Sequence, residues 1–432
     1  MRSSFSRRKF LQAAVAAGTA IPSAAPWLAR ADDLRETRSP NEKLNLGVIG
    51  VAGRGGSNLR GVKGENIVIL CDIDAQRLAK AAEAHPKAKT CEDYRHVFDE
   101  KNLDGVVVST PDHMHALPVV QALRQGLDVY CEKPLTHSVY EARVIGKLAA
   151  ESQAVTQLGS QIHAGTNYRR VVEIIKAGII GPVRRVHVWQ GGGVRTGQRV
   201  EQGTPPKWVS YDLWLGPAPY RPFHESHFHF NWRYWWDFGG GQLADFWCHY
   251  VDLAFWSLDL KFPTTIEAQG QKGHDGDNEC PNFMQVDYEF PARGDQPPVH
   301  LTWYHGGWKP QGAEVYEKGS AVLFEGTDGR LLADYGTRKL FMQTGKEARP
   351  VKPSIPDSIG HHREWIEAVK SRGTTTCKFE YGGPLTEAGL LGNVSYRVGK
   401  KKLLWDAENL KATNCLEADP LIRREYRKGW TL

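Results

Sequence analysis

The chain has 432 residues, of which 41% are hydrophobic and 24% are charged, and its formal net charge is +6. This length favours two domains of ordinary size. Residues 1–31 hold five basic residues and no acidic one, so the remaining chain is almost neutral. Such a charge balance excludes the basic footprint of a nucleic-acid-binding protein.

The N-terminal segment is typical of an export signal. Residues 6–11 read SRRKFL, a twin-arginine motif, and an apolar run then extends to Ile21. Residues 29–31 read ARA, the small-residue pattern of a cleavage site. We therefore expect residues 1–31 to be a twin-arginine signal peptide and the protein to be periplasmic or otherwise exported. The apolar run is about 12 residues long, which is too short for stable membrane insertion.

Short apolar runs alternate with helical stretches between residues 42 and 160. The predicted strands are residues 44–49, 67–71, 105–109, 128–131 and 155–158. The predicted helices are residues 75–84, 94–99, 116–125 and 139–150. Short buried strands separated by helices indicate an α/β domain with a parallel, doubly wound Rossmann sheet.

A glycine-rich turn follows the first predicted strand. Gly50-x-Ala52-x-x-Gly55 has the spacing of the dinucleotide-binding fingerprint, with alanine at the middle position. Asp72 follows the second strand, where a carboxylate accepts hydrogen bonds from the adenosine ribose and repels a 2′-phosphate. These features predict NAD rather than NADP, although Asp72 could instead cap the next helix. The residues predicted to contact the dinucleotide here are Gly50, Ala52, Gly53, Arg54, Gly55 and Asp72.

The pattern changes after residue 160, where strands begin to follow one another without helices between them. We expect helices at 167–177, 241–258, 361–370 and 385–399, and a long loop at 191–238. The predicted strands are residues 182–189, 265–271, 283–290, 299–305, 321–325 and 330–335. This order predicts a second, α+β domain at residues 161–405 with a large, mostly antiparallel open sheet, and a C-terminal tail at 406–432. We expect His361 and His362 to be solvated.

Tryptophan is concentrated in this second region. Apart from Trp27, every tryptophan lies at Trp189 or later. These side chains either fill the core or provide flat surfaces on which sugar rings stack. The loop candidates for sugar stacking are Trp208, Trp214, Trp232, Trp235 and Trp236.

Polar segments follow two of the predicted strands of the first domain. The carboxyl ends of parallel strands are where such sheets bind ligands. The residues predicted to contact the cofactor there are Ser109, Thr110, Pro111, His113, His115, Glu132 and Lys133. The ammonium group of Lys133 is suited to stabilising a developing alkoxide. His224, His227 and His229 fit no standard zinc spacing, so no metal site is predicted.

Several motifs along the chain resemble the glucose-fructose oxidoreductase / inositol dehydrogenase / MocA family, in particular an exported, tryptophan-rich branch. The motifs are residues 93–95 (DYR), 109–115 (STPDHMH), 132–134 (EKP), 159–163 (GSQIH), 212–217 (DLWLGP), 235–239 (WWDFG) and 422–426 (IRREY). The resemblance places Lys133 beside the nicotinamide and makes Asp245 and His249 a catalytic pair, with His249 as general acid or base. A buried, hydrogen-bonded His249 is the alternative.

Gln161, in the motif at 159–163, is expected at the cofactor. Apart from the resemblance, Tyr168 and Arg233 are weaker candidates for contacts to the substrate or the nicotinamide, and Trp232 and Asp252 are weaker candidates for the substrate, with Asp252 also suited to a structural pair. The resemblance also implies an assembly state. A homo-oligomer, either a dimer or a tetramer, is implied because the second sheet of family members often packs against another subunit.

These features together predict an exported, NAD-dependent oxidoreductase that acts on a sugar or sugar derivative. Since free NAD is scarce outside the cytoplasm, the cofactor is expected to be retained through many turnovers. One alternative is an NAD-dependent glycoside hydrolase that oxidises, eliminates, hydrates and reduces its substrate in place. A non-catalytic sugar-binding protein is an alternative of another class.

Overall fold

The computed structural model describes residues 39, 41–191 and 198–432. The predicted signal peptide therefore lies outside the described residues. Within the described part of the chain, none of the helices combines the length and the apolar character that crossing a bilayer requires.

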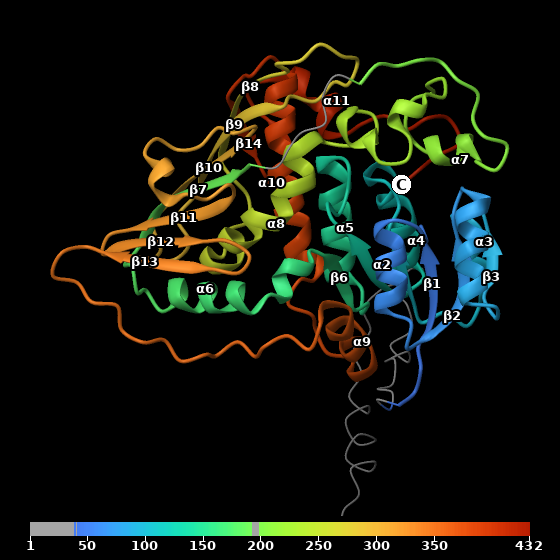
Figure 1. Cartoon of the computed structure of the whole chain (residues 1–432), viewed down its shortest axis with the longest axis horizontal. Coiled ribbons are helices and arrows are strands. Elements are labelled where there is room, and N and C mark those ends of the chain that lie inside the picture. Colours follow the sequence, from blue (N-terminus) through green and yellow to red (C-terminus); the bar gives the residue numbers. More distant parts are fainter. Residues whose placement is uncertain (1–38, 40, 192–197) are drawn as a thin grey trace, which may run out of the picture. The chain divides into compact units, whose positions relative to one another are not determined.

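The first domain contains a six-stranded sheet in which all strands are parallel (Figure 1). The strands are β1 (Asn45–Ile49), β2 (Asn66–Cys71), β3 (Lys89–Cys91), β4 (Gly105–Val108), β5 (Asp128–Glu132) and β6 (Thr156–Gly159). They lie in the order β3-β2-β1-β4-β5-β6, the doubly wound order of a Rossmann fold. Every residue of β4 and β5 is buried, and the centre of each strand is apolar, as expected where helices cover both faces of the sheet. The predicted Rossmann fold is confirmed.

Helices connect these strands, and local sequence signals set where they begin. They are α2 (Arg54–Gly61), α3 (Ala75–Ala84), α4 (Ala116–Arg124) and α5 (Val139–Glu151). Asp74 caps α3, and Ser138 forms a capping box with Glu141 at the start of α5. The stretch predicted as a helix at 94–99 is a 3₁₀ helix, η1 (Tyr94–Asp99).

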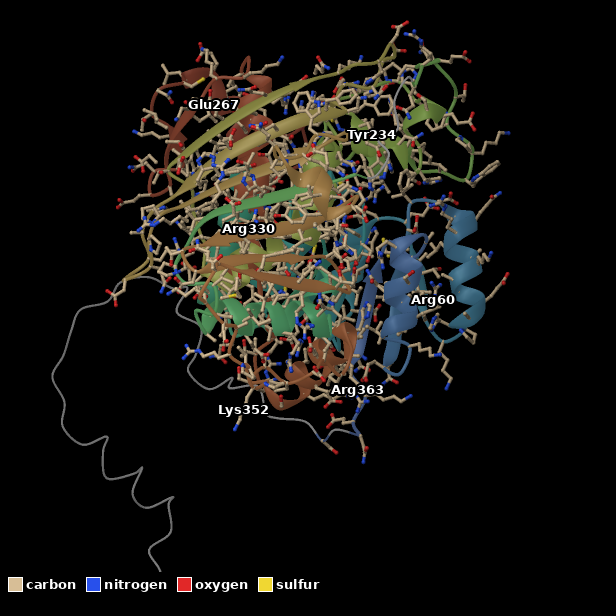
Figure 2. All side chains as sticks on the ribbon, turned by 60° about the vertical axis from the view of Figure 1, so that its left-hand side comes forward. Arg60, Tyr234, Glu267, Arg330, Lys352 and Arg363 are labelled. Carbon is tan, nitrogen blue, oxygen red and sulfur yellow. The ribbon has the colours of Figure 1, made fainter. Side chains whose placement is uncertain are left out.

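The second domain contains a nine-stranded sheet, in the order β13-β12-β11-β7-β10-β9-β8-β14-β15. Its strands are β7 (Val183–Gln190), β8 (Thr265–Gln271), β9 (Phe283–Phe290), β10 (Val299–His305), β11 (Ala321–Gly326), β12 (Gly329–Ala333), β13 (Arg338–Met342), β14 (Leu403–Asp406) and β15 (Lys411–Ala412). Only the pair β7–β10 is parallel within this sheet, so the predicted, mostly antiparallel sheet is confirmed. Figure 2 brings this sheet forward, with Glu267 on β8 and Arg330 on β12.

Three long helices accompany this sheet: α6 (Thr166–Lys176), α8 (Gly241–Leu258) and α10 (Phe379–Arg397). Side chains alternate between buried and half-buried along β9, so one face of the sheet carries the core. The helix α10 contacts α8 and β8 in the second domain and α5 in the first, which joins the two cores.

The remaining helical segments are short. They are η2 (Asp112–Met114), η3 (Gln161–Ala164), α7 (Tyr211–Leu215), η4 (Glu225–His227), η5 (Asn231–Tyr234), η6 (Ala313–Tyr316), η7 (Leu416–Ala418) and α11 (Asp419–Ile422). The segment predicted as one long loop at 191–238 thus contains three helical turns in its described part, α7, η4 and η5.

The helix α9 (His361–Ser371) belongs to the core of the first domain, although it lies far along the chain. The side chain of Trp365 is 0% exposed and its Nε1 donates to the Val155 carbonyl at 3.1 Å. The expectation that His361 and His362 are solvated is wrong. His361 is buried and contacts the Tyr130 hydroxyl, and His362 stacks on the Tyr130 ring. The buried face of α9 places both histidines against the first sheet. A helix from beyond residue 160 thus completes the core of the first domain, so the predicted domain boundary at residue 160 does not assign every element to the right core.

We expect Trp365→Ala to lower the free energy of unfolding by about 3–5 kcal/mol, because the substitution leaves a cavity in this core. Chemical denaturation measures the change. As a control, Leu416→Ala removes a side chain that is 79% exposed and should shift stability by no more than about 0.5 kcal/mol. Equal effects of the two substitutions would show that α9 does not stabilise the first domain.

Candidate active site

A cavity of about 610 Å³ opens at the carboxyl ends of β1, β2, β4 and β5. Residues of α7, η5 and α8 complete its wall, so both domains contribute to it. The volume lies within the range of small-molecule sites. Clefts at this edge of a doubly wound sheet are where such folds bind nucleotides.

The glycine-rich turn fits a dinucleotide. Gly50 has φ +83°, and a Cβ there would lie 2.6 Å from the Ser109 carbonyl oxygen. A Cβ on Gly55 would lie 2.1 Å from the Gly50 oxygen, so glycine lets α2 approach the sheet. Gly53 caps α2 without a side-chain hydrogen bond and faces open space, and the first turn contains no acidic residue. The N–H groups at this helix end are therefore available to a pyrophosphate.

Asp72 stands where the ribose of a dinucleotide would lie. Its carboxylate accepts hydrogen bonds from the backbone N–H of Val51 at 2.9 Å and of Asp74 at 3.1 Å. Burial raises the pKa of Asp72. The alternative that Asp72 caps the following helix is wrong, because Asp74 does so by accepting from Gln76 and Arg77. Asp72 lines the cavity instead and remains available to a ribose diol.

Lys133 and Asp245 form an ion pair between the two domains. Lys133 directly follows β5, and Asp245 lies in the first part of α8. The Lys133 Nζ donates to Asp245 Oδ1 at 2.5 Å and to the Asp245 carbonyl at 2.6 Å. Burial opposes the negative charge on Asp245, but Lys133 and Arg233 outweigh it and hold the pKa of Asp245 well below its usual range. The carboxylate is thus ionised, and it fixes the ammonium group at the cavity wall.

His249 lies one helical turn after Asp245 and also lines the cavity. Among the described residues, its ring has no hydrogen-bond partner; the backbone carbonyl of His249 accepts from the Tyr168 hydroxyl at 2.7 Å. Burial and the nearby Lys133 charge lower the pKa of His249 to about 3. The imidazole is therefore neutral at pH 7, with one ring nitrogen that can accept a hydrogen bond. Asp245 contacts Lys133 rather than orienting this ring, which differs from the expected pairing.

Most of the residues predicted for the site line this one cavity. They are Gly50, Ala52, Gly53, Arg54, Asp72, Ser109, Thr110, Pro111, His115, Glu132, Lys133, Trp232, Arg233, Asp245 and His249. The residues that do not line it are Gly55, His113, Gln161, Tyr168 and Asp252.

His113, Gln161 and Tyr168 do not line the cavity, and each contacts another part of the protein. The ring of His113 contacts the Trp214 carbonyl at 2.8 Å. Gln161 donates to Glu132 at 2.6 Å, and Tyr168 is fully buried. The Tyr168 hydroxyl donates to the His249 carbonyl at 2.7 Å, so each of the three side chains has at least one protein partner.

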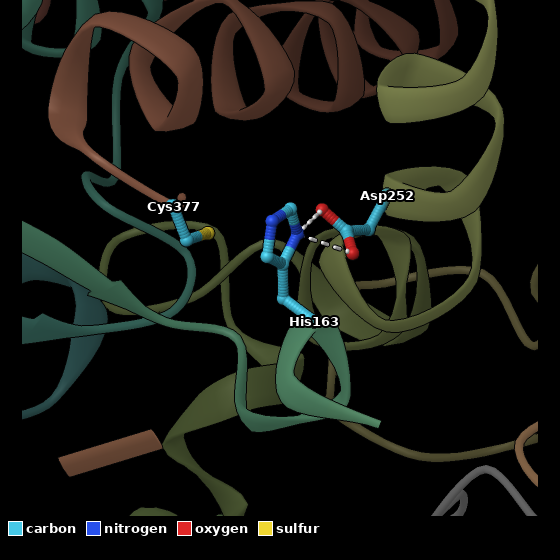
Figure 3. A group of neighbouring side chains, drawn as sticks. All are labelled: His163, Asp252 and Cys377. Carbon is cyan, nitrogen blue, oxygen red and sulfur yellow. Dashed lines mark hydrogen bonds and ion pairs between the residues drawn. The ribbon is translucent and has the colours of Figure 1, made fainter. Parts of the chain in front are cut away.

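Asp252 does not line the cavity either. It is buried two turns after Asp245, where both its oxygens lie 3.0 Å from the Nδ1 of His163 (Figure 3). Tyr381 donates to Asp252 at 2.7 Å. Of the described residues, only His163, Asp252 and Cys377 bring three metal-binding side chains together. The imidazole lies between the carboxylate and the thiol in Figure 3, and burial raises the pKa of Cys377. The group therefore forms a buried polar network that ties α8 to η3 and α10.

The aromatic candidates separate into different environments. Trp214 and Trp232 line the cavity, whereas Trp235 is buried against His227. Trp208 is exposed, and Trp236 is half-buried beneath the guanidinium of Arg397.

Sequence reasoning missed Asp112, which lines the same cavity. Its side chain is buried near Arg233, Asp245 and Lys133, and burial raises its pKa to about 7. The residue lies inside the motif at 109–115, which was the available signal. Tyr94 also lines the cavity and lies in the motif DYR at residues 93–95. Phe230 and Trp430 line it too, and no local pattern in the sequence marks them.

Comparisons with protein families agree with this architecture. Residues 44–160 match "Oxidoreductase family, NAD-binding Rossmann fold", and residues 164–432 match "Oxidoreductase family, C-terminal alpha/beta domain". The chain belongs to the Gfo/Idh/MocA oxidoreductase family. Its first domain is an NAD-binding Rossmann fold, as predicted.

Individual proteins of known name share only a small part of this sequence. Inositol 2-dehydrogenase of Rubrobacter xylanophilus is 27% identical over 177 residues, which is 40% of this chain and 49% of the relative. The chain thus spans about half the length of the curated relatives that it matches. The WlbA dehydrogenase of Bordetella pertussis, solved with NADH and UDP-GlcNAcA, superposes with a TM-score of 0.61 at 15% identity, covering 84% of this chain and 99% of that one. A levoglucosan dehydrogenase solved with NADH and levoglucosan has a TM-score of 0.57 at 14% identity, covering 82% of this chain and 98% of that one.

Asp112 generates a pH-dependent prediction. A carboxyl group with a pKa of about 7 in the folded protein and about 4 in the unfolded chain disfavours folding once it ionises. The favourable contribution of the protonated Asp112 to the free energy of unfolding is therefore fully present below about pH 4, and it is lost as the pH rises to about 7. Asp112→Asn does not ionise, so its stability relative to the unsubstituted protein should increase between pH 5 and pH 8.

Thermal unfolding of Asp112→Asn and of the unsubstituted protein at pH 5 and at pH 8, with equal NAD occupancy, measures this difference in stability. Glu347→Gln, which changes an exposed carboxylate, should follow the unsubstituted protein throughout. A constant offset between Asp112→Asn and the unsubstituted protein at pH 5 and pH 8 would contradict the assignment.

Proposed function

We propose that the protein is an exported, NAD-dependent oxidoreductase that acts on a sugar or sugar derivative and keeps its cofactor between turnovers. The observation that carries this proposal is the arrangement of Lys133, Asp245 and His249 in the cavity that contains the dinucleotide turn. The ammonium group of Lys133 and the neutral imidazole of His249 thus lie in the same cavity as the glycine-rich turn that would bind NAD.

The site residues can perform the proton chemistry of alcohol oxidation. NAD, when bound, supplies the hydride acceptor. The ammonium group of Lys133 has three N–H donors, and the two contacts to Asp245 leave one for a substrate oxygen. Charge that develops on this oxygen is stabilised by the ammonium group. The imidazole of His249 is neutral and lines the same cavity, so we assign it the role of accepting the hydroxyl proton as the hydride leaves.

The cavity is suited to a polyhydroxylated substrate. Trp214, Trp232 and Phe246 supply apolar surface, and Asp112 and Arg233 supply polar groups beside it. Sites that combine a few polar groups with aromatic walls fix both the position and the orientation of a small ligand. The named substrates of the relatives, inositol and levoglucosan, are polyols or sugars.

Export and retention of the cofactor are linked in this proposal. The twin-arginine motif at residues 6–11 supports export of the folded chain. A protein that leaves the cytoplasm enters a compartment in which free NAD is scarce, so it must carry its nucleotide with it. A retained cofactor has to be reoxidised in place, either by a second sugar or by the product of the first step.

A redox-neutral glycoside hydrolase is the second candidate, and Asp112 favours it. Oxidation of a ring hydroxyl acidifies the neighbouring C–H, whose proton His249 can accept. The C1 substituent then leaves with the C1–O electron pair, and a carboxyl group with a pKa near 7, as in Asp112, can protonate it. Addition of water and return of the hydride close the cycle without net oxidation. Lys133, Asp245 and His249 in one cavity argue against a non-catalytic sugar-binding protein.

One assay on protein purified without added NAD distinguishes these functions. Bound nucleotide together with sugar-dependent absorbance of NADH would support the oxidoreductase. Release of aglycone from chromogenic glycosides without net NADH would support the hydrolase instead. Protein that carries no nucleotide and binds none would overturn both proposals.

We expect His249→Ala to lower turnover by about 10²- to 10⁴-fold, the usual contribution of a general acid or base. The amount of bound NAD should stay unchanged, because the ring lies beside the reacting centre and not at the glycine-rich turn. His96→Ala, which removes an exposed histidine, is the matched control and should retain full activity. Unchanged turnover of His249→Ala would remove this residue from the mechanism.

A further inference from the structure

Three segments from outside the first domain lie at or next to the end of the cavity that contains Asp72. His229, Phe230 and Trp430 line the cavity, and residues 208–210 pair with the chain just after Asp72 without lining the cavity themselves. We propose that these segments, here called the adenosine clasp, hold the adenosine half of bound NAD and make its release slow. The proposal rests on the binding of NAD in the proposed function and adds the residues that retain it.

Residues 208–210 pair with the chain that directly follows Asp72. The N–H of Ala75 donates to the Trp208 carbonyl at 2.8 Å, and the N–H of Ser210 donates to the Ile73 carbonyl at 2.9 Å. These two bonds flank an antiparallel bridge between Asp74 and Val209. The segment that carries the ribose-binding acid is therefore fastened to the second domain by backbone hydrogen bonds.

Residues 229–230 reinforce the same junction. The Nε2 of His229 lies 3.1 Å from Asp74 Oδ2. Burial lowers the pKa of His229 to about 4, so at neutral pH the ring donates as a neutral imidazole. The next residue, Phe230, lines the cavity and packs over the guanidinium of Arg233. This segment thus connects the adenosine end of the cavity with its reactive end.

Trp430 brings the C-terminal tail to the rim of the cavity. Its ring stacks on Tyr94 with centroids 6.4 Å apart and an interplanar angle of 27°, and the guanidinium of Arg95 lies 5.2 Å from the ring centre. Both aromatic rings line the cavity together with Asp72. A flat ligand at this end of the cavity would therefore meet two aromatic side chains.

Backbone contacts of Arg427 fix the position of this tail. Its N–H donates to the Pro217 carbonyl and its Nε donates to the Gly216 carbonyl, each at 3.0 Å. The guanidinium also pairs with Asp212. These contacts, three residues earlier in the chain, hold Trp430 beside the cavity.

The chemistry of the clasp matches an adenosine. Purine rings stack on aromatic side chains, and loss of one stacking ring weakens binding by about 10- to 100-fold. Asp72 at the same end accepts the ribose hydroxyls. Release of the nucleotide would require the tail to move, and such a barrier acts mainly on the dissociation rate.

Trp430→Ala in the full-length protein tests the proposal. The readouts are the NAD content after gel filtration and the rate at which bound NADH fluorescence is lost on chase with excess NAD. We expect release to accelerate about 10- to 100-fold. Trp430→Phe should restore most of the retention, and Tyr220→Ala, which removes an aromatic ring that is 71% exposed, should behave as the unsubstituted protein.

Competition with nucleotide fragments completes the test. Trp430→Ala should weaken the binding of AMP and leave the binding of nicotinamide mononucleotide unchanged. Suppose that the unsubstituted protein retains NAD, and that Trp430→Ala and a chain ending at Lys428 both release NAD as slowly as the unsubstituted protein does. The adenosine clasp is then wrong, and the proposed function stands. If the unsubstituted protein binds neither NAD nor AMP, the proposed function itself fails.

Discussion

The ion pair between Lys133 and Asp245 fixes the end of β5 against the start of α8, and the chemistry of the cavity depends on this contact. Both side chains are largely buried, with 12% and 17% of their surfaces exposed. Removing one partner of a buried pair leaves an uncompensated charge, typically at a cost of about 3–5 kcal/mol. The pair therefore restricts the arrangement of the two domains as well as the direction of the ammonium group. The neutral state of His249 follows in part from the same charge, because Lys133 adds to the effect of burial.

Much of the fold could be predicted because its strongest signals are local. The strands β1, β4 and β5 are almost entirely buried and each contains a short apolar run, and glycines and caps mark where the helices begin. The short edge strand β3 consists of Lys89, Thr90 and Cys91, whose polar character hides it from an apolar pattern. The packing of α9 on the first domain was missed for another reason. Its apolar face shows that it is buried, but only the tertiary structure decides which core it joins.

Those site residues that lie at the end of a strand could be predicted from the sequence, because the strand itself determines their position. Residues at the carboxyl ends of β1, β2, β4 and β5 meet at one edge of a parallel sheet, so Gly50, Asp72, Thr110 and Lys133 converge. Sequence spacing could not separate Asp245, which reaches the cavity, from Asp252, which lies two turns deeper against His163. The adenosine end of the cavity depends on contacts between segments far apart in the chain, and such contacts leave no local pattern.

Electron density for the protein crystallised with NAD would test most directly whether both domains build one catalytic hollow. We predict the pyrophosphate at the N-terminus of α2 and the nicotinamide ring between the Lys133 ammonium group and the His249 imidazole. The ion pair between Lys133 and Asp245 should remain in place. A nicotinamide ring remote from both side chains, or NAD bound elsewhere on the molecule, would contradict this arrangement.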